Sequence, residues 1–352
     1  MSNTWGTHIK LSIFGESHGH GVGITIGGLK PGITLDMDFI RTQMARRAPG
    51  KSELSTSRTE TDDFEILSGL YENKTTGAPL TIFIRNENVR SSDYDKNIFR
   101  PGHADLTAFY KYKGFADIRG GGHFSGRLTA PIVFAGAVAK QILKDKGIDI
   151  SAKINAIGGI YDKHTDTSEI GEISKKDFPV KDDKIMQAMK NAILDAKNKG
   201  DSLGGIIECA ITGIPTGLGS PFFDSVESTI SSMIFSIPAI KGIEFGDGFG
   251  MAEKKGSEAN DQMYIENNKI KLKTNHNGGI LGGITNGEPI VFRAAVKPTP
   301  TIAVEQDTIN IEKMENHKLK AAGRHDPCIV LRAVPVIEAA AAICVLELTE
   351  EK

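Results

Sequence analysis

Residues 333–348 read AVPVIEAAAAICVLEL, an apolar run that only Glu338 and Glu347 interrupt. The run is too short and too charged to span a bilayer, so it predicts a buried helix from Pro335 to Leu348. A second apolar stretch, Thr129 to Lys146, has a proline near its first turn and a glycine after its end. Because both helices are apolar on most faces, we expect them at the centre of the fold.

Further helices and several strands are predicted around these two helices. Two further helices, Asp36 to Arg47 and Asp182 to Lys199, begin at acidic residues and end before glycine or Pro-Gly. Alternating apolar residues predict half-buried strands over residues 23–26, 80–84, 148–154, 206–211, 270–273 and 290–296. This order is neither regular βαβ nor all-β, so it indicates an α+β fold in which sheets cover buried helices. Residues 162–184 are polar, and we expect them to form a solvated excursion.

Composition limits the class of protein. The 352 residues are 39% hydrophobic and 24% charged, which is typical of globular chains, and no linker divides them, so residues 1–352 are expected to form one domain. A net charge of −2 gives no general basic surface, and we expect no nucleic-acid partner. The three distant cysteines share no metal-ligand spacing, and no metal site is predicted. With no secretory signal or membrane span visible, a cytoplasmic protein without a membrane partner is expected.

Histidine-bearing glycine loops carry the chemistry. They read FGESHGHG over 14–21, FRPGHAD over 99–105 and DIRGGGHFSGR over 117–127. Histidine in such a turn can reach a ligand and transfer a proton near neutral pH. A glycine loop that leads into a helix can bind an anion with its backbone amides, and Ser125 and Arg127 add a hydroxyl and a cation. Taken alone, each loop could instead be a turn with a solvated histidine, and a Ser17 nucleophile is disfavoured because Ser17 with the adjacent His18 does not form a triad geometry.

Two more segments extend this pattern. Residues 297–301, KPTPT, form a stiff loop with hydroxyls, and residues 323–328, GRHDPC, place cation, histidine and carboxylate ahead of the last helix. No Rossmann or P-loop motif is present, so any flavin or nucleotide must be held in another way.

Together these segments resemble the chorismate synthases, from about Thr4 to about Leu346. The most specific matches are FGESHG at 14–19, RPGHAD at 100–105 and GRHDPC at 323–328. The resemblance implies an anti 1,4-elimination of phosphate from 5-enolpyruvylshikimate 3-phosphate, giving chorismate with reduced FMN and no net redox change. It also implies a β-α-β sandwich, with central helices between antiparallel sheets, that assembles as a homotetramer.

The same resemblance implies site residues. His18 would be the general acid beside the leaving phosphate, His103 would lie near the flavin N1 and C2 carbonyl, and Asp326 near the flavin N5. The positions that match FMN contacts are His123, Phe124, Ser125, Pro238, Ala239, Gly282, Lys297, Pro298, Thr299, Pro300, Thr301 and Arg324. Arg47 matches a position linked to NADPH or substrate, and the candidates for binding the substrate are Arg47, Ser125, Arg127 and Arg332.

The chain departs from the family pattern at three places. His123 and Phe124 stand where many members have Arg-Ser, Pro238 stands where many have Asn, and Ala48 alters the segment after the double arginine. A flavin oxidoreductase that consumes NADPH would share the glycine loops and cations. A regulatory module that binds anions would explain the arginines but not the three histidine turns. NADPH is the candidate reductant for the flavin, acting on this chain or through an external system.

Overall fold

The two apolar helices lie against each other at the centre of the fold, as α3 (Thr129–Asp145) and α8 (Val330–Glu350). This computed structural model describes residues 3–50, 54–55, 60–87, 95–321 and 326–350. The two helices run in the same direction and approach closely at Gly136, where an added Cβ would lie 2.2 Å from the Cβ of Ala339. The crossing therefore requires a glycine on one helix and a small residue on the other.

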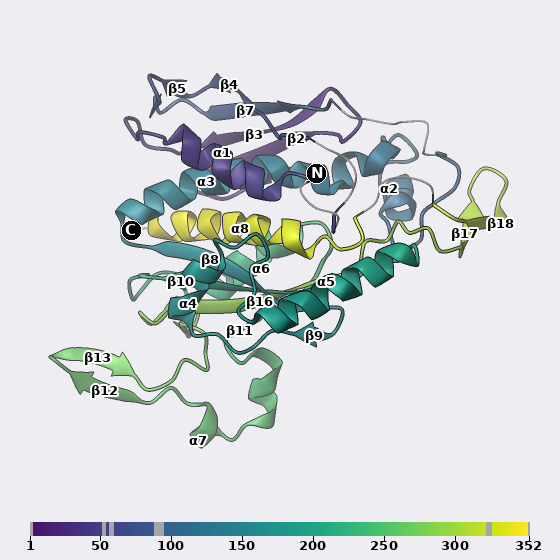
Figure 1. Ribbon diagram of the computed structural model, residues 1–352. Coiled ribbons are helices and arrows are strands. Elements are labelled where there is room, and N and C mark those ends of the chain that lie inside the picture. The colour runs from purple at the N-terminus through teal and green to yellow at the C-terminus, as the bar shows by residue number, and fades with distance from the viewer. Residues whose placement is uncertain (1–2, 51–53, 56–59, 88–94, 322–325, 351–352) are drawn as a thin grey trace.

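Two five-stranded antiparallel sheets enclose these helices (Figure 1). The strand order of the first sheet is β1 (Thr4–Trp5), β2 (Lys10–Gly15), β3 (Gly21–Gly27), β7 (Leu80–Arg85) and β4 (Glu65–Ser68). The order of the second is β11 (Ile240–Phe245), β16 (Ile290–Val296), β10 (Gly205–Thr212), β8 (Asp149–Ile157) and β9 (Ile160–Tyr161). The inner faces are apolar, since alternate residues of β3, β7 and β16 are almost fully buried.

Two more helices complete the inner layer. α1 (Met37–Arg47) contacts α3 and α8, and the side chain of Asp36 caps its first turn. α6 (Val226–Ser236) lies between α8 and β11. This is the expected α+β architecture, a β-α-β sandwich with helices between antiparallel sheets, and it is confirmed. The sequence prediction missed α6 because its serines break up the apolar stripe.

The remaining elements lie outside the sandwich. They are α2 (Asp105–Lys111), α4 (Thr167–Ile173), α5 (Asp183–Asn198), α7 (Gly256–Ala259) and the strand pairs β5–β6 (Leu70–Tyr71, Lys74–Thr75), β12–β13 (Met263–Glu266, Lys269–Leu272), β14–β15 (Ile280–Leu281, Ile284–Thr285) and β17–β18 (Gln306–Asn310, Glu315–Leu319). In Figure 1 the β12–β13 hairpin projects from the lower end of the molecule. No helix within the described residues has the length and apolarity needed to cross a bilayer.

Two local expectations were wrong. The last helix begins at Val330 rather than at Pro335, which lies inside it; burial among apolar neighbours outweighs the hydrogen bond that proline cannot donate. The segment 162–184 is not simply solvated. It contains α4, its residues Ile170 and Phe178 are buried, and the buried carboxylate of Asp162 lies 3.2 Å from the Lys153 ammonium.

One charged group is buried among the central helices. The carboxylate of Glu338 on α8 is 1% exposed and contacts Arg46 of α1 at 2.6 Å, Lys140 of α3, and the backbone N–H of Ala152 in β8 at 3.0 Å. Burial alone would raise the pKa of Glu338, but Lys140 and Arg46 lower it from 4.5 to about 2. One carboxylate thus joins two helices and a strand to α8.

We expect Glu338→Gln to lower the free energy of unfolding at pH 7 by about 3 kcal/mol, because two partly buried cations lose the charge of their buried partner. A carboxylate with a lowered folded-state pKa contributes stability above pH 4.5, and this is lost as the pH falls towards 2. The variant should therefore lose less stability over that interval, measured by urea unfolding at a series of pH values. Glu172→Gln, at an exposed ion pair with Lys175, is the matched control.

Candidate functional site

The loop between β2 and β3 carries His18 and is bound to the triple-glycine loop. The backbone N–H of Ser17 donates to the Gly122 carbonyl at 3.1 Å, and the Ser17 hydroxyl donates to the Arg119 carbonyl at 3.2 Å. His123 Nδ1 lies 2.9 Å from the Gly15 carbonyl, and because a carbonyl only accepts, this nitrogen carries the proton. His123 therefore joins the two loops of the site.

The rings of His18 and His103 pack against two consecutive glycines. A Cβ on Gly120 would lie 2.3 Å from Cδ2 and 2.4 Å from Nε2 of His18. A Cβ on Gly121 would lie 3.2 Å from Nε2 of His103. Both glycines have positive φ angles, +60° and +96°, which suit glycine. The rings of the two predicted catalytic histidines thus pack on neighbouring residues of one loop.

A buried carboxylate orients His103. Asp105 accepts from Nδ1 of His103 at 3.0 Å and from the Arg100 guanidinium at 2.7 and 2.8 Å. Burial alone would raise the pKa of Asp105, but hydrogen bonds from Arg100 and His103 hold it well below its usual range. Since an ionised carboxylate only accepts, the proton of His103 is on Nδ1 and its Nε2 faces the glycine loop.

The stiff loop 297–301 lies beside the histidine turn. The Lys297 ammonium donates to the Gly102 carbonyl at 2.6 Å, and the backbone N–H of Lys297 donates to Ala239 at 2.9 Å. A Cβ on Gly102 would lie 3.3 Å from the Cβ of Pro300. The segments 238–239 and 297–301, both predicted to contact flavin, are therefore neighbours of His103.

A group of arginines lies at the start of α3. Arg47, at 3% exposure, donates to the Gly126 carbonyl at 3.0 Å and to the Thr129 hydroxyl at 3.2 Å. Arg332 donates to the Arg47 carbonyl at 3.1 Å and forms an ion pair with Asp326. The cations predicted for the substrate and the predicted proton-handling Asp326 therefore form one connected group.

Two carboxylates of this group carry no signal in the sequence. Asp62 contacts both Arg47, at 2.6 Å, and Arg127, and Glu60 lies 3.1 Å from Arg127. The local pattern around Asp62 gives no sign of burial, because it is a short acidic stretch like many exposed loops. Only the fold, which packs this stretch under the start of α3, identifies it.

The family model described as chorismate synthase matches residues 9–349. This chain belongs to the chorismate synthase family. A chorismate synthase of Dehalococcoides mccartyi is 44% identical over 353 residues, which cover 99% of this chain and 96% of the relative. One of Thermococcus kodakarensis is 43% identical over 344 residues, covering 97% of this chain and 96% of the relative.

A solved structure agrees with the sequence relatives. It is described as a crystal structure of chorismate synthase, has a TM-score of 0.77 and 30% identity, and covers 99% of this chain and 93% of that one. The function is accordingly that of the family, the anti 1,4-elimination of phosphate from 5-enolpyruvylshikimate 3-phosphate to give chorismate. Chorismate synthases use reduced FMN.

The described residues fit a flavin at the loop 297–301. The hydroxyl oxygen of Thr299 is buried and has no hydrogen-bond partner among them. A buried hydroxyl without a partner costs free energy, so a ligand that binds there would be stabilised. The adjacent Lys297 ammonium and the nearby glycine backbone would suit the anionic and polar edges of such a cofactor.

One predicted flavin contact, Gly282, is not gathered here, and another, Arg324, lies outside the described residues. Gly282 is in the β14–β15 turn, where the neighbouring Gly283 carbonyl accepts from the first residue of α6, Val226. This turn adjoins the Ile290 end of β16, whereas Lys297 follows the opposite end, roughly 20 Å along a seven-residue strand.

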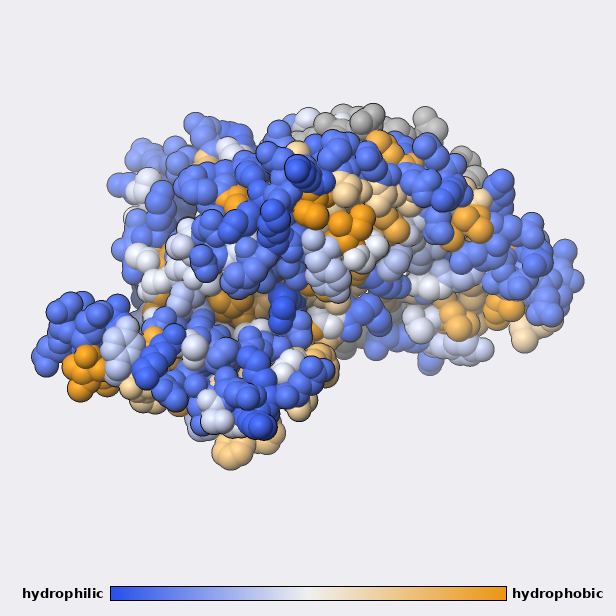
Figure 2. Space-filling view, turned by 60° about the horizontal axis from the view of Figure 1, so that its bottom comes forward, coloured by the Kyte–Doolittle hydropathy of each residue, from blue (hydrophilic) through white to orange (hydrophobic). Residues whose placement is uncertain are grey.

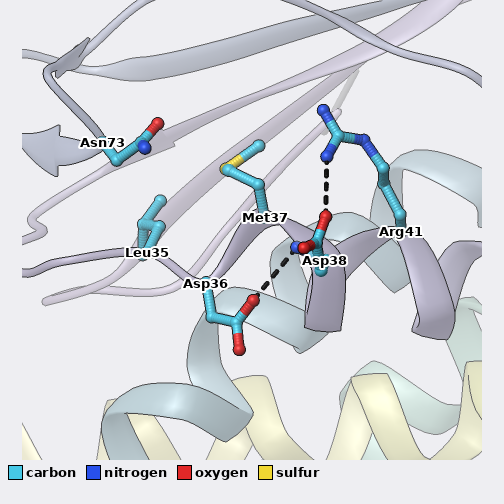
Figure 3. Close-up of a pocket in the computed structure, with 6 residues that line it drawn as sticks. All are labelled: Leu35, Asp36, Met37, Asp38, Arg41 and Asn73. Carbon is cyan, nitrogen blue, oxygen red and sulfur yellow. Dashed lines mark hydrogen bonds and ion pairs between the residues drawn. The ribbon is translucent and has the colours of Figure 1, made fainter.

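Another hollow of the surface does not suit the substrate. It has a volume of about 420 Å³ and lies at the start of α1 (Figure 3). Two carboxylates, Asp36 and Asp38, face it with one cation, Arg41. A substrate with a phosphate and two carboxylates would be repelled, so the arginine group beneath the glycine loop is the better anion site.

Gly120→Ala is expected to lower turnover at least about a hundredfold, because the added methyl would displace His18 and strain the loop. Gly126→Ala is the control, since its Cβ would meet nothing within 4 Å. Turnover of both variants should be compared at saturating flavin and substrate. A Gly120→Ala protein as active as Gly126→Ala would contradict the packing of His18 on Gly120.

Proposed function

We propose that His18 is the general acid that protonates the leaving phosphate. Phosphate leaves more readily when protonated, and histidine can supply a proton near neutral pH. The position of His18 against Gly120, in the glycine loop that leads into α3, supports this role. The adjacent Ser17 has its hydroxyl committed to the Arg119 carbonyl, so it acts as a neighbour and not as a nucleophile.

We propose that His103 and Asp326 hold and move protons beside the flavin. When bound, reduced FMN supplies a transient electron to the substrate. His103 presents Nε2 because Asp105 holds the proton on Nδ1. The ion pair of Asp326 with Arg332 keeps this carboxylate oriented. Asp326 would help relay the ring hydrogen.

We propose that Arg47 and Arg332 bind the carboxylates or phosphate of the substrate, with Ser125 adding a hydroxyl. A trianionic substrate requires several cations, and guanidinium groups bind such anions in a forked geometry. Arg127 adds positive charge behind Arg47, because its guanidinium is already engaged with Asp62, the Asn86 side chain and the Arg85 carbonyl. The flavin contacts remain those of 123–125, 238–239, 297–301 and Arg324.

We propose that NADPH acts only as a reductant of flavin, through an external system, and that Arg47 serves the substrate. The buried position of Arg47 at the start of α3 suits a small anion better than a dinucleotide. An anaerobic assay with chemically reduced FMN should release phosphate without NADPH. Loss of one NADPH per product would instead support the oxidoreductase alternative.

The decisive variant is His18→Ala. It should lower turnover by about 10²–10⁴ while substrate affinity changes little, because general acid catalysis acts on the leaving group. Phosphate release under anaerobic conditions measures this effect. His20→Ala, an exposed histidine two residues away, is the control. A His18→Ala turnover within about threefold of the unmodified enzyme would rule out the proposed role.

We further propose that the chain is a single domain that assembles as a cytoplasmic homotetramer. The β12–β13 hairpin supports assembly, because Met263, Ile265 and Ile270 on it are 66–78% exposed, and an isolated hairpin is marginally stable in water. Apolar surface lies at the projecting left end of the molecule in Figure 2, where this hairpin lies. A second copy would cover this apolar surface. Because Gly282 lies apart from the loop 297–301 of its own chain, it would reach flavin only from another subunit.

Replacing Ile265 and Ile270 together with Glu should shift the assembly to smaller species, because charge at an apolar contact opposes burial. Light scattering coupled to size-exclusion chromatography measures the mass. Lys271→Glu is a control on the same hairpin. An unchanged tetramer in the double variant would remove the hairpin from the proposed interface.

A further inference from the structure

Asp62 holds two buried arginines at once. Its side chain is fully buried, and its two carboxylate oxygens separate the partners: Oδ2 accepts from Arg47 at 2.6 Å, and Oδ1 accepts from Arg127. Burial alone would raise the pKa of Asp62, but Arg47 and Arg127 hold it below its usual range. An ionised carboxylate therefore lies between two like charges that would otherwise repel each other.

The backbone at Asp62 is also unusual. Its φ angle is +57°, in the left-handed region that residues other than glycine rarely adopt. Such a conformation costs free energy and persists where the surroundings require it. Asp and Asn are among the residues that tolerate it, because their short side chains bond locally. The strained backbone directs this carboxylate at the two guanidinium groups.

The two arginines differ in how many N–H groups they leave available to a ligand. Arg47 uses three of its five N–H groups on described residues: Nη1 on Asp62, Nη2 on Gly126 and Nε on Thr129. The other two N–H groups can bind a ligand. The guanidinium plane is fixed by three acceptors on different elements, so these two groups have a set direction.

Arg127 has more of its N–H groups engaged than Arg47. Its guanidinium contacts Asp62, Glu60 at 3.1 Å, the Asn86 side chain at 3.1 Å and the Arg85 carbonyl at 3.0 Å. It therefore anchors Asp62 from behind, while Arg47 lies on the side of the glycine loop and Arg332.

We propose that Asp62 is a positioning residue for substrate binding: it holds Arg47 and Arg127 as one unit and aims the remaining N–H groups of Arg47 at an anionic group of the substrate. This inference rests on the proposed role of Arg47. Its energetic effect is preorganisation, because the substrate does not have to reorder two repelling cations when it binds. Substrate affinity should therefore depend on Asp62 more than the chemical step does.

The test is Asp62→Asn, which keeps the size and the tolerance of the left-handed backbone but removes the charge. The amide can accept from one arginine only and turns its NH₂ towards the other. We expect the Kd for 5-enolpyruvylshikimate 3-phosphate, measured calorimetrically with oxidised FMN present, to rise about ten- to a hundredfold. KM should rise in parallel while kcat stays within about threefold.

The matched control is Asp63→Asn. Asp63 is exposed and accepts from the Thr61 hydroxyl, so its variant should keep the Kd within about twofold. An Asp62→Asn protein with the affinity of Asp63→Asn would overturn the inference. A fall in kcat at unchanged Kd would also overturn it. Failure of the unmodified protein to bind this substrate would count against the proposed function itself.

Arg127→Lys provides a second variant that does not depend on the folding of the first. Lysine keeps the charge but cannot contact the four acceptors together, so Asp62 loses its anchor and the Kd should rise. In the double variant of Asp62→Asn and Arg127→Lys, the two increases in Kd should not multiply, because both substitutions act through Arg47. An unchanged Kd in Arg127→Lys, or effects that multiply fully, would contradict the proposed unit.

Discussion

The packing of α3 on α8 is the contact on which the rest of the molecule depends. The helices run side by side in the same direction, and Gly136 against Ala339 allows the close approach. Because the glycine loop precedes α3 and Asp326 precedes α8, the same contact brings the two loops together at one end. The site is therefore a consequence of how two apolar helices pack, and not of any local sequence motif.

The opposite end of α8 fixes another part of the site. The carboxylate of Glu347 accepts from the backbone N–H groups of Thr7, His8 and Ile9 at distances from 2.6 to 3.2 Å. These residues lead directly into β2, which ends at the loop that carries His18. A charged group in an apolar helix is satisfied by consecutive amides, and it ties the start of the chain to the core.

Two buried carboxylates in this protein are each matched by two cations. Glu338 is matched by Arg46 and Lys140, and Asp62 by Arg47 and Arg127. The two groups are linked through neighbouring residues of α1, because Arg46 faces the helix core and Arg47 faces the glycine loop. The same helix therefore connects the stability of the sandwich with the order of the substrate site.

The sequence by itself determined the central helices, most strands and the histidine loops, because apolar periodicity and glycine-histidine clusters are local properties. It also determined the family, through strings such as residues 14–19 and 100–105. It could not identify α6, the buried part of 162–184 or the start of α8, since burial there depends on distant neighbours. Only the tertiary structure decided that Asp62 holds two arginines and that Gly282 lies apart from Lys297. Both depend on how separate segments of the chain pack in space, and no local pattern of residues records that.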